Sequence, residues 1–148
     1  MTTQLSEHFT LEEMIASDTA DRLGIDNTPS ETNQLNLAWT CDELEGVREL
    51  LGKRPIIINS GYRCPDLNKA VGGSSSSDHM KGFAVDFTCP EYGTPLEICQ
   101  IIMDSNLRFS QLIYEYTWVH IAFVPIDMGK LVVMTKQKNG YFPGLVVV

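Results

Sequence analysis

Two short apolar segments each present one metal-binding side chain beside an alanine. If residues 82–87 form a β-strand, Ala84 and Asp86 share one face while large apolar residues occupy the other. A second segment repeats this pattern with His120 and Ala122. Because an ion with an open coordination position needs room for water and substrate, the small alanines favour a metal site on this face.

His79 lies in the turn expected just before the first strand and completes a candidate ligand set with Asp86 and His120. Two imidazoles and one carboxylate suit Zn²⁺ with a fourth position open to water, whose pKa the ion lowers to roughly 7. A closed structural zinc site would favour cysteines. Any one of these residues alone is better explained as an ordinary loop histidine, strand histidine or turn acid. The three together predict a catalytic zinc site.

Hydrolysis also needs a general base, and Glu115 is the candidate. Tyr116 and Thr117 can form a two-residue loop between two antiparallel strands. In that register Ile113 pairs with His120, and Glu115 lies diagonal to His120 on the same face, at a Cβ spacing of roughly 7–8 Å. Tyr-Thr lacks the Gly or Asn that tight hairpin turns prefer, and a three-residue loop would turn Glu115 to the other face. A solvent-facing strand acid is therefore the alternative.

The elements that must position these side chains are helices first and strands later. Capping-box patterns at Thr10 and Thr94 predict the start of two helices. Apolar residues at helical spacing from Leu35 to Leu51 predict a long amphipathic helix between them. Strands are predicted at 55–59, which should be buried, and at 82–87, 111–115, 118–124 and 130–135, with turns at 127–129 and 139–140. This order predicts an α+β fold in which helices pack on a small antiparallel sheet.

Length and composition limit the class of protein. With 148 residues, 43% of them hydrophobic, the chain suits a single soluble domain spanning 1–148, since two full domains would be cramped. The net charge of −8 argues against nonspecific nucleic-acid binding through phosphates. No apolar run approaches the length of a membrane span, so no stable membrane anchoring is expected.

Two further features concern the compartment and the loops. The first residues carry no basic segment followed by an apolar one, which predicts synthesis in the cytoplasm without a signal peptide. The four cysteines are scattered, which indicates reduced and mostly structural thiols. Residues 72–77, GGSSSS, predict a flexible loop.

Three motifs in order along the chain resemble those of the M15 zinc peptidases, the family of D-alanyl-D-alanine carboxypeptidases and phage endolysins. Residues 77–86, SDHMKGFAVD, resemble its S-x-H-x-x-G-x-A-x-D motif, and residues 118–120, WVH, resemble its second metal motif. Residues 60–73, SGYRCPDLNKAVGG, are similar to its S-G-Y-R-x-P-x-L-N-x-x-V-G-G segment. The resemblance covers the chain from about residue 6 to residue 125 and implies a fold like that of Hedgehog domains and DD-peptidases.

The resemblance implies roles for individual residues. It implies zinc binding by the three candidate ligands and catalysis by Glu115 together with Arg63, whose guanidinium would hold the substrate carbonyl or the developing oxyanion. Ser77, Tyr62 and Trp118, which stand in the same motifs, are expected to contact the substrate. An ordinary surface arginine and a solubilising serine are the alternatives for Arg63 and Ser77.

One position departs from the family pattern. Many relatives carry the catalytic Asp or Glu three residues before the last histidine, where this chain has Thr117, which cannot serve as a general base. Glu115 matches an acid that the small single-domain branch carries slightly farther upstream.

The resemblance implies a zinc-dependent peptidase acting on the stem peptides of peptidoglycan. D-alanyl-D-alanine carboxypeptidase activity and cleavage of an L-alanyl-D-glutamate bond by an endolysin are both compatible with the motifs. We expect a monomer that reaches the cell wall from the cytoplasm after phage-mediated release. The alternative is a catalytically silent, zinc-stabilised binding or structural module of a phage particle, and Thr117 is the residue that favours it.

Overall fold

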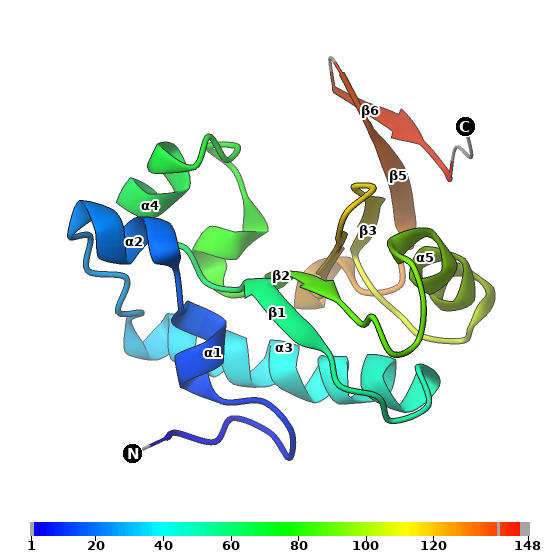
Figure 1. The fold of residues 1–148 in the computed structure, drawn as a ribbon, viewed down its shortest axis with the longest axis horizontal. Helices are drawn as coiled ribbons and strands as arrows, with labels where there is room; N and C mark the ends of the chain where they lie inside the picture. Colours follow the sequence, from blue (N-terminus) through cyan, green and yellow to red (C-terminus); the bar gives the residue numbers. More distant parts are fainter. Residues whose placement is uncertain (1, 139, 146–148) are drawn as a thin grey trace.

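The structure is a computed structural model that describes residues 2–138 and 140–145 (Figure 1). The α-helices are α1 (Leu11–Ile15), α2 (Asp18–Leu23), α3 (Glu31–Leu50), α4 (Pro65–Ala70) and α5 (Pro95–Asp104). Two 3₁₀ turns are η1 (Asp78–Lys81) and η2 (Pro125–Asp127). The strands are β1 (Ile57–Ser60), β2 (Ala84–Thr88), β3 (Gln111–Tyr114), β4 (Val119–Ala122), β5 (Val132–Gln137) and β6 (Gly140–Pro143).

The six strands form one sheet in the order β1-β2-β4-β3-β5-β6. The predicted α+β class is confirmed, but the expectation of an antiparallel sheet is wrong at one place, because β3 and β5 are parallel. Strand β4 is already paired on both edges, with β2 and β3. The chain therefore turns back through η2 and adds β5 to the free edge of β3. A strand that reverses direction relative to β4 runs parallel to β3, since β3 and β4 are antiparallel.

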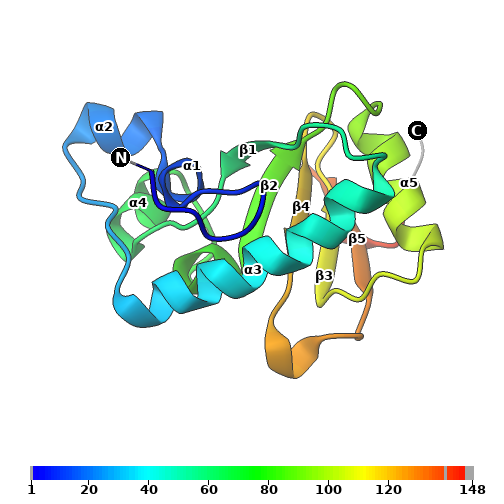
Figure 2. The same ribbon diagram turned by 90° about the horizontal axis from the view of Figure 1, so that it is seen from below.

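Helices α3 and α5 pack against one face of this sheet (Figure 2). The apolar residues that alternate along β2 and β4 point into this core and are fully buried: Val85, Phe87, Val119 and Ile121. The alternation predicted for these two strands is therefore confirmed, and the opposite face of the sheet is left to carry polar side chains.

Local signals place the helix starts correctly. Thr10 and Thr94 each form a complete capping box at the start of α1 and α5. Ser30 caps α3 by accepting a hydrogen bond from the backbone N–H of Asn33. Leu35 was predicted on the buried face of this helix but is 72% exposed, because the first turns of α3 extend beyond the strands (Figure 2).

The strand predicted as buried at 55–59 is an edge strand instead. It begins at Ile57, which is half exposed, and only Ile56 before it is buried. Within residues 2–138 and 140–145, strand β1 pairs on one side alone, with β2, so it lacks a second neighbour that would enclose it. None of the described helices has both the length and the apolar character needed to cross a bilayer.

The predicted strand at 130–135 corresponds to β5, which continues into β6 as an antiparallel hairpin. Of the turn predicted at 139–140, Asn139 lies outside the described residues. All four cysteines are free thiols, and Cys64 alone among them is partly exposed.

Candidate metal centre and its pocket

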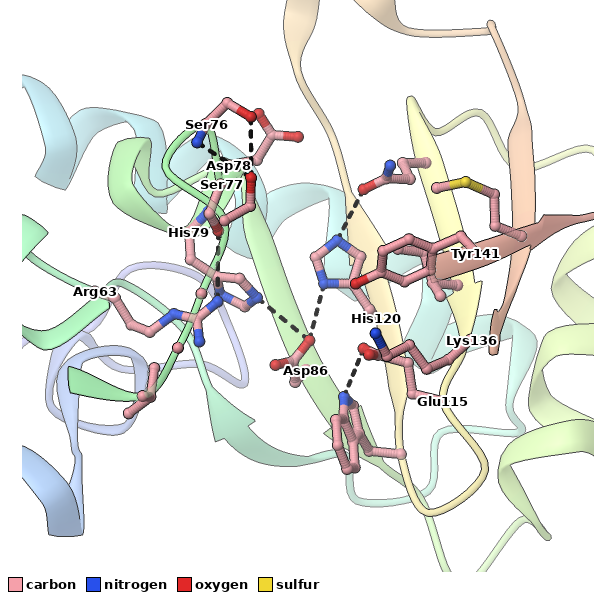
Figure 3. Close-up of a pocket in the computed structure, with 18 residues that line it drawn as sticks. Arg63, Ser76, Ser77, Asp78, His79, Asp86, Glu115, His120, Lys136 and Tyr141 are labelled. Atoms are coloured by element: carbon pink, nitrogen blue, oxygen red, sulfur yellow. Dashed lines mark hydrogen bonds and ion pairs between the residues drawn. The ribbon is translucent and has the colours of Figure 1, made fainter. Parts of the chain in front are cut away.

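A pocket of about 510 Å³ lies on the sheet face opposite α3 and α5 (Figure 3). Strands β2 to β6 supply one side of it, and the segments around η1 and the start of α4 supply the other. The predicted site residues that line it are Arg63, Ser77, His79, Asp86, Glu115, Trp118 and His120. The structure therefore brings together side chains from segments almost sixty residues apart.

Tyr62 is the one predicted site residue that the structure does not bring to this pocket. Its side chain is 5% exposed and belongs to the hydrophobic core. Its backbone N–H donates to the carbonyl of Met14 at 2.7 Å, and its carbonyl accepts from the amide of Asn27 at 3.0 Å. The expected substrate contact does not agree with this buried position, and the residue adjoins a separate, smaller depression that Arg63 also borders.

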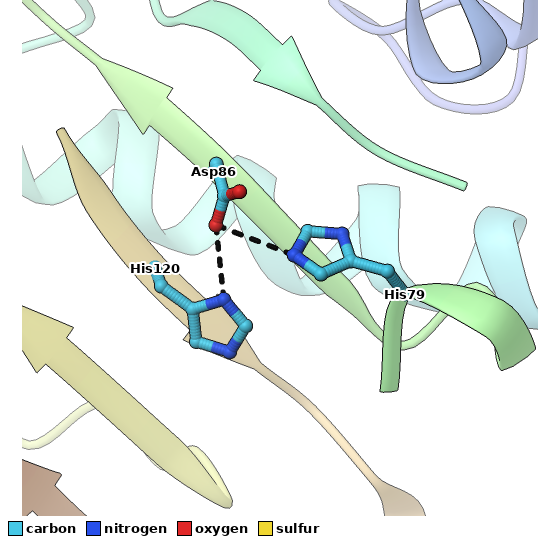
Figure 4. A group of neighbouring side chains, drawn as sticks. All are labelled: His79, Asp86 and His120. Carbon is cyan, nitrogen blue, oxygen red and sulfur yellow. Dashed lines mark hydrogen bonds and ion pairs between the residues drawn. The ribbon is translucent and has the colours of Figure 1, made fainter. Parts of the chain in front are cut away.

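The three candidate ligands meet at one point (Figure 4). Asp86 on β2 and His120 on β4 are direct partners in the sheet register. The Oδ1 atom of Asp86 lies 2.9 Å from Nδ1 of His120 and 3.3 Å from Nε2 of His79. One ligand atom from each residue lies within 4.8 Å of the other two. Because β-strands pair in register, two ligands come from the sheet and only the third depends on the turn before β2.

That turn is η1, and it is held in place at both ends. The Ser77 hydroxyl accepts a hydrogen bond from the His79 backbone N–H at 3.2 Å. Gly82 ends the turn with φ of +84°, a left-handed conformation that favours glycine. A Cβ atom at Gly82 would lie 2.9 Å from the carbonyl oxygen of Asn33 on α3. The turn therefore packs tightly against α3, which aims His79 at the sheet.

Hydrogen bonds behind the two imidazoles select their tautomers. His79 Nδ1 donates to the carbonyl oxygen of Gly61 at 2.7 Å, and His120 Nε2 donates to the Oε1 atom of Gln111 at 3.1 Å. Both acceptors are carbonyl oxygens, so each favours a proton on the nitrogen that faces it, while Asp86 Oδ1 faces the other nitrogen of His120 at 2.9 Å. His79 Nε2 and His120 Nδ1 are left to face Asp86.

This arrangement fits a metal ion. His79 Nε2 is buried and has no hydrogen-bond partner of satisfactory geometry, although Asp86 lies beside it. A buried polar atom in this condition is costly unless another partner binds it. Two imidazoles backed by carbonyl acceptors and one carboxylate form a donor set that suits Zn²⁺ with an open position. The predicted zinc cofactor is supported by this geometry.

Electrostatics keep the ligands in their binding forms. Burial alone would raise the pKa of the Asp86 carboxyl, but the nearby His79 and His120 outweigh it and hold the pKa below its ordinary value. Burial lowers the pKa of His79, which favours the neutral imidazole. An ionised carboxylate and a neutral imidazole are the states that coordinate a metal.

Arg63 lies beside the ligands at the start of the segment that leads into α4. Its backbone N–H donates to the carbonyl of His79 at 3.1 Å, and its Nη2 donates to the Ser77 hydroxyl at 3.4 Å. Burial lowers the pKa of Arg63, whereas the charges of Asp86 and Glu115 raise it; the guanidinium remains charged. Among the described residues its Nε–H is buried without a hydrogen-bond partner, and the residue lines the pocket.

Glu115 lies on the pocket face, as the two-residue loop predicted. Ile113 pairs with His120, and the Glu115 backbone N–H donates to the Trp118 carbonyl at 3.2 Å. Tyr116 adopts φ of +65°. This conformation is unfavourable for a residue other than Gly or Asn, and the tight turn requires it here. Trp118 Nε1 donates to the Glu115 carboxylate at 2.8 Å. Burial, assisted by the charge of Asp86, raises the pKa of Glu115.

Several pocket residues were not identified from the sequence. Gln111 backs His120, and Met134, Lys136 and Tyr141 line the pocket from the C-terminal hairpin. Gln111 could have been found, because it alternates with Ile113 and Glu115 on the same strand face. The hairpin residues carried no such signal, since their position depends on the pairing of β5 with β3.

The GGSSSS segment, predicted as a loop, also lines this pocket. It connects α4 with η1, and Asn68 of α4 donates through its side-chain amide to the carbonyl of Ser74 at 2.8 Å. Gly73 lies so close to Asn68 that a Cβ atom would overlap its Oδ1 atom, at 2.1 Å. The loop is therefore fastened to α4 next to the pocket entrance.

Comparison with known proteins identifies a family and a relative. A family model described as Peptidase M15 matches residues 7–122, which include the three ligands, Arg63 and Glu115. Zinc D-Ala-D-Ala carboxypeptidase of Streptomyces albus G is 37% identical over 62 residues, a stretch that covers 42% of this chain and 24% of that protein. The matched part thus spans about a quarter of the length of that relative. The family match ends within β4, before the C-terminal hairpin.

Proposed function

Because the chain belongs to the M15 family of zinc peptidases, we propose that it hydrolyses a peptide bond in the stem peptides of peptidoglycan. The observation that carries this proposal is the convergence of a His-Asp-His ligand set, a charged arginine and a carboxylate around one pocket. The relative from Streptomyces albus G, named for D-Ala-D-Ala, supports a substrate of this class. Cleavage of a D-alanyl-D-alanine bond and cleavage of an L-alanyl-D-glutamate bond are the two forms of the proposal. The proposal includes that the protein acts at the cell wall after phage-mediated release from the cytoplasm.

His79, Asp86 and His120 would hold Zn²⁺ through His79 Nε2, His120 Nδ1 and the Asp86 carboxylate. When bound, zinc supplies Lewis acidity that polarises a carbonyl and lowers the pKa of water. Asp86 keeps its charge at neutral pH because its pKa is low. Gly61 and Gln111 keep the ligating nitrogens aimed at this point.

Arg63 stabilises the negative charge that develops on the substrate carbonyl oxygen during attack. Its guanidinium is half buried on the pocket wall and retains an unpaired Nε–H. Ser77 accepts from one of its terminal nitrogens and thereby limits its rotation. A fixed cation at this place lowers the barrier because no reorganisation is needed when the charge appears.

Glu115 accepts the proton of the attacking water and returns it to the leaving amine. Its raised pKa makes the carboxylate a stronger base than an exposed glutamate. The hydrogen bond from Trp118 holds the Oε2 atom of the carboxylate, and Glu115 lines the pocket. Thr117 stands where many M15 peptidases carry the catalytic Asp or Glu. Its hydroxyl group cannot serve as a general base.

The test uses zinc-loaded protein and defined stem peptides, with products identified by mass spectrometry. We expect Glu115→Gln to lower kcat by about 10²–10⁴-fold while zinc stoichiometry stays unchanged. Glu91→Gln removes the same charge from an exposed turn outside the pocket and serves as the control. A wild-type protein that binds zinc but cleaves neither bond would favour the silent binding module instead.

The same residue sets the expected pH dependence. Glu115 must be ionised to accept a proton, and its pKa lies above the ordinary value of 4.5 because of burial and the charge of Asp86. The value of kcat/KM should therefore fall as the pH is lowered through a point above 4.5. A profile at saturating zinc measures this limb. A profile in which kcat/KM does not fall on the acid side contradicts the role of Glu115.

A further inference from the structure

The C-terminal hairpin forms one wall of the pocket. Strand β5 lies beside β3 in parallel register, so that Ile113 is opposite Met134 and the next position on the same face of β5 is Lys136. Strand β6 then places Tyr141 directly opposite Lys136. The register of the sheet therefore carries these three side chains of the hairpin onto the face that holds the metal ligands. The family match ends before this hairpin, which makes the wall a feature of the chain beyond the matched region.

Lys136 is a cation in this wall, and its charge acts on the nearby Glu115 carboxylate without forming an ion pair with it among the described residues. Its side chain is half buried, and its Nζ atom lies 4.5 Å from the centre of the Tyr141 ring. Within the described part of the chain, its ammonium forms no ion pair, whereas Lys53 and Lys130 pair with neighbouring carboxylates. A cation that is partly desolvated and held over a ring face retains donors for an anionic group.

Arg63 and Lys136 occupy opposite sides of the pocket (Figure 3). Arg63, Ser77 and His79 lie on one side, Lys136 and Tyr141 lie on the other, and Asp86 stands between them. A peptide that crosses the pocket with its scissile carbonyl at the metal ligands and Arg63 presents another part of its length to the hairpin. The stem peptides of the proposed function carry free carboxylates, which are the natural partners of a lysine.

We propose that Lys136, positioned over the ring of Tyr141, binds a free carboxylate of the peptide substrate and so selects acidic over amidated peptides. This inference rests on the proposed function and adds to it a specificity determinant outside the matched family region. Two carboxylates of a stem peptide have this chemistry: the α-carboxylate of the γ-linked D-glutamyl residue and the C-terminal carboxylate. The experiment distinguishes them.

The experiment compares three synthetic peptides. The first is L-alanyl-γ-D-glutamyl-L-lysyl-D-alanyl-D-alanine, the second carries an amide on the D-glutamyl α-carboxylate, and the third carries a C-terminal amide. Steady-state kinetics are measured for the wild type, Lys136→Met, Lys136→Arg and Lys138→Met. Lys138 lies exposed in the turn of the same hairpin and outside the pocket, so it is the matched control for charge.

We expect the wild type to prefer the acidic peptide over one of the two amides by about tenfold in kcat/KM. The amide that is disfavoured identifies which carboxylate Lys136 binds. Lys136→Met should abolish this preference through KM, Lys136→Arg should keep most of it, and Lys138→Met should behave as the wild type. Circular dichroism of each variant checks that the hairpin substitution leaves the fold intact.

Two results overturn the inference. In the first, Lys136→Met retains the wild-type preference. In the second, the variant loses the same factor in kcat on all three peptides, which shows that Lys136 acts through the nearby Glu115 and not on the substrate. If no peptide is cleaved, calorimetric binding of the same peptides to zinc-loaded protein separates the two proposals. A preference that depends on Lys136 then supports the carboxylate site while the peptidase function fails, and equal binding overturns both.

Discussion

The metal ligands are only the inner part of this site, because each imidazole depends on an acceptor behind it. Gly61 supplies a backbone carbonyl to His79, and Gln111 supplies a side-chain carbonyl to His120. An imidazole without such an acceptor can change its tautomer or rotate, which weakens its bond to a metal. Gln111 is thus a positioning residue, since it orients a ligand without being one.

Replacing Gln111 with methionine tests this role. Gln111→Met removes the acceptor of His120 Nε2 at nearly constant volume, so the zinc dissociation constant should rise by about 10–100-fold. Gln137→Met makes the same change at an exposed position at the end of β5 and should leave the constant unchanged. Competition with a chromophoric chelator measures both. Equal affinities for the two variants would show that the hydrogen bond does not orient His120.

At the scale of elements, the short helix α1 supports the site from behind β1. The Met14 carbonyl at the end of α1 accepts from the Tyr62 backbone N–H, and a Cβ atom at Gly61 would lie 2.3 Å from the same Met14 oxygen. Immediately next to this contact, the Gly61 carbonyl accepts from His79, and the Arg63 N–H donates to the His79 carbonyl. Close approach of α1 to this segment therefore sets the position of one ligand.

Gly61→Ala should separate α1 from this segment. The inserted methyl group must displace backbone atoms, which costs about 1–3 kcal/mol of unfolding free energy and moves the carbonyl that orients His79. Urea denaturation with a chelator present measures the stability, and chelator competition measures zinc affinity. Gly24→Ala is the control, because its Cβ meets nothing within 4 Å although its φ is +67°. That variant should lose stability alone, so a loss of zinc affinity in both would contradict the coupling.

At the scale of the whole molecule, the ligand set joins the sheet to the turn that precedes β2. Asp86 and His120 belong to the sheet, whereas His79 belongs to η1, which packs with α4 and α3. Three ligands that converge only in the folded state couple metal binding to folding.

Zinc should therefore stabilise the entire fold. Free zinc at 100 times its dissociation constant adds about 2.7 kcal/mol to the unfolding free energy, and a chelator should remove this increment. Calorimetry with and without zinc measures it. His120→Ala should eliminate the increment, whereas His8→Ala should retain it, because His8 contacts Glu45 away from the pocket. An increment that survives in His120→Ala would show that the metal binds elsewhere.

Much of the site could be predicted because its signals are local. Strand alternation placed Asp86 and His120 on one face, since successive side chains of a strand point to opposite sides whatever the rest of the fold does. The hairpin register followed from the two-residue loop and correctly oriented Glu115. The motif resemblance then assigned Arg63 to the same site as these residues. Arg63 does line the pocket together with them.

The positions of Tyr62 and Lys136 are not determined by local sequence signals. Tyr62 stands in the same motif as Arg63, yet the close contact with α1 turns it into the core. Lys136 belongs to no recognised motif. It lies at the pocket because β5 pairs with the edge of β3 that β4 leaves free. The side on which a residue lies is a property of its own backbone, and the chain order reveals it. The tertiary structure decides which strand edges of the sheet remain unpaired and which elements cover each of its faces. The reason is that both depend on how all the strands and helices pack together.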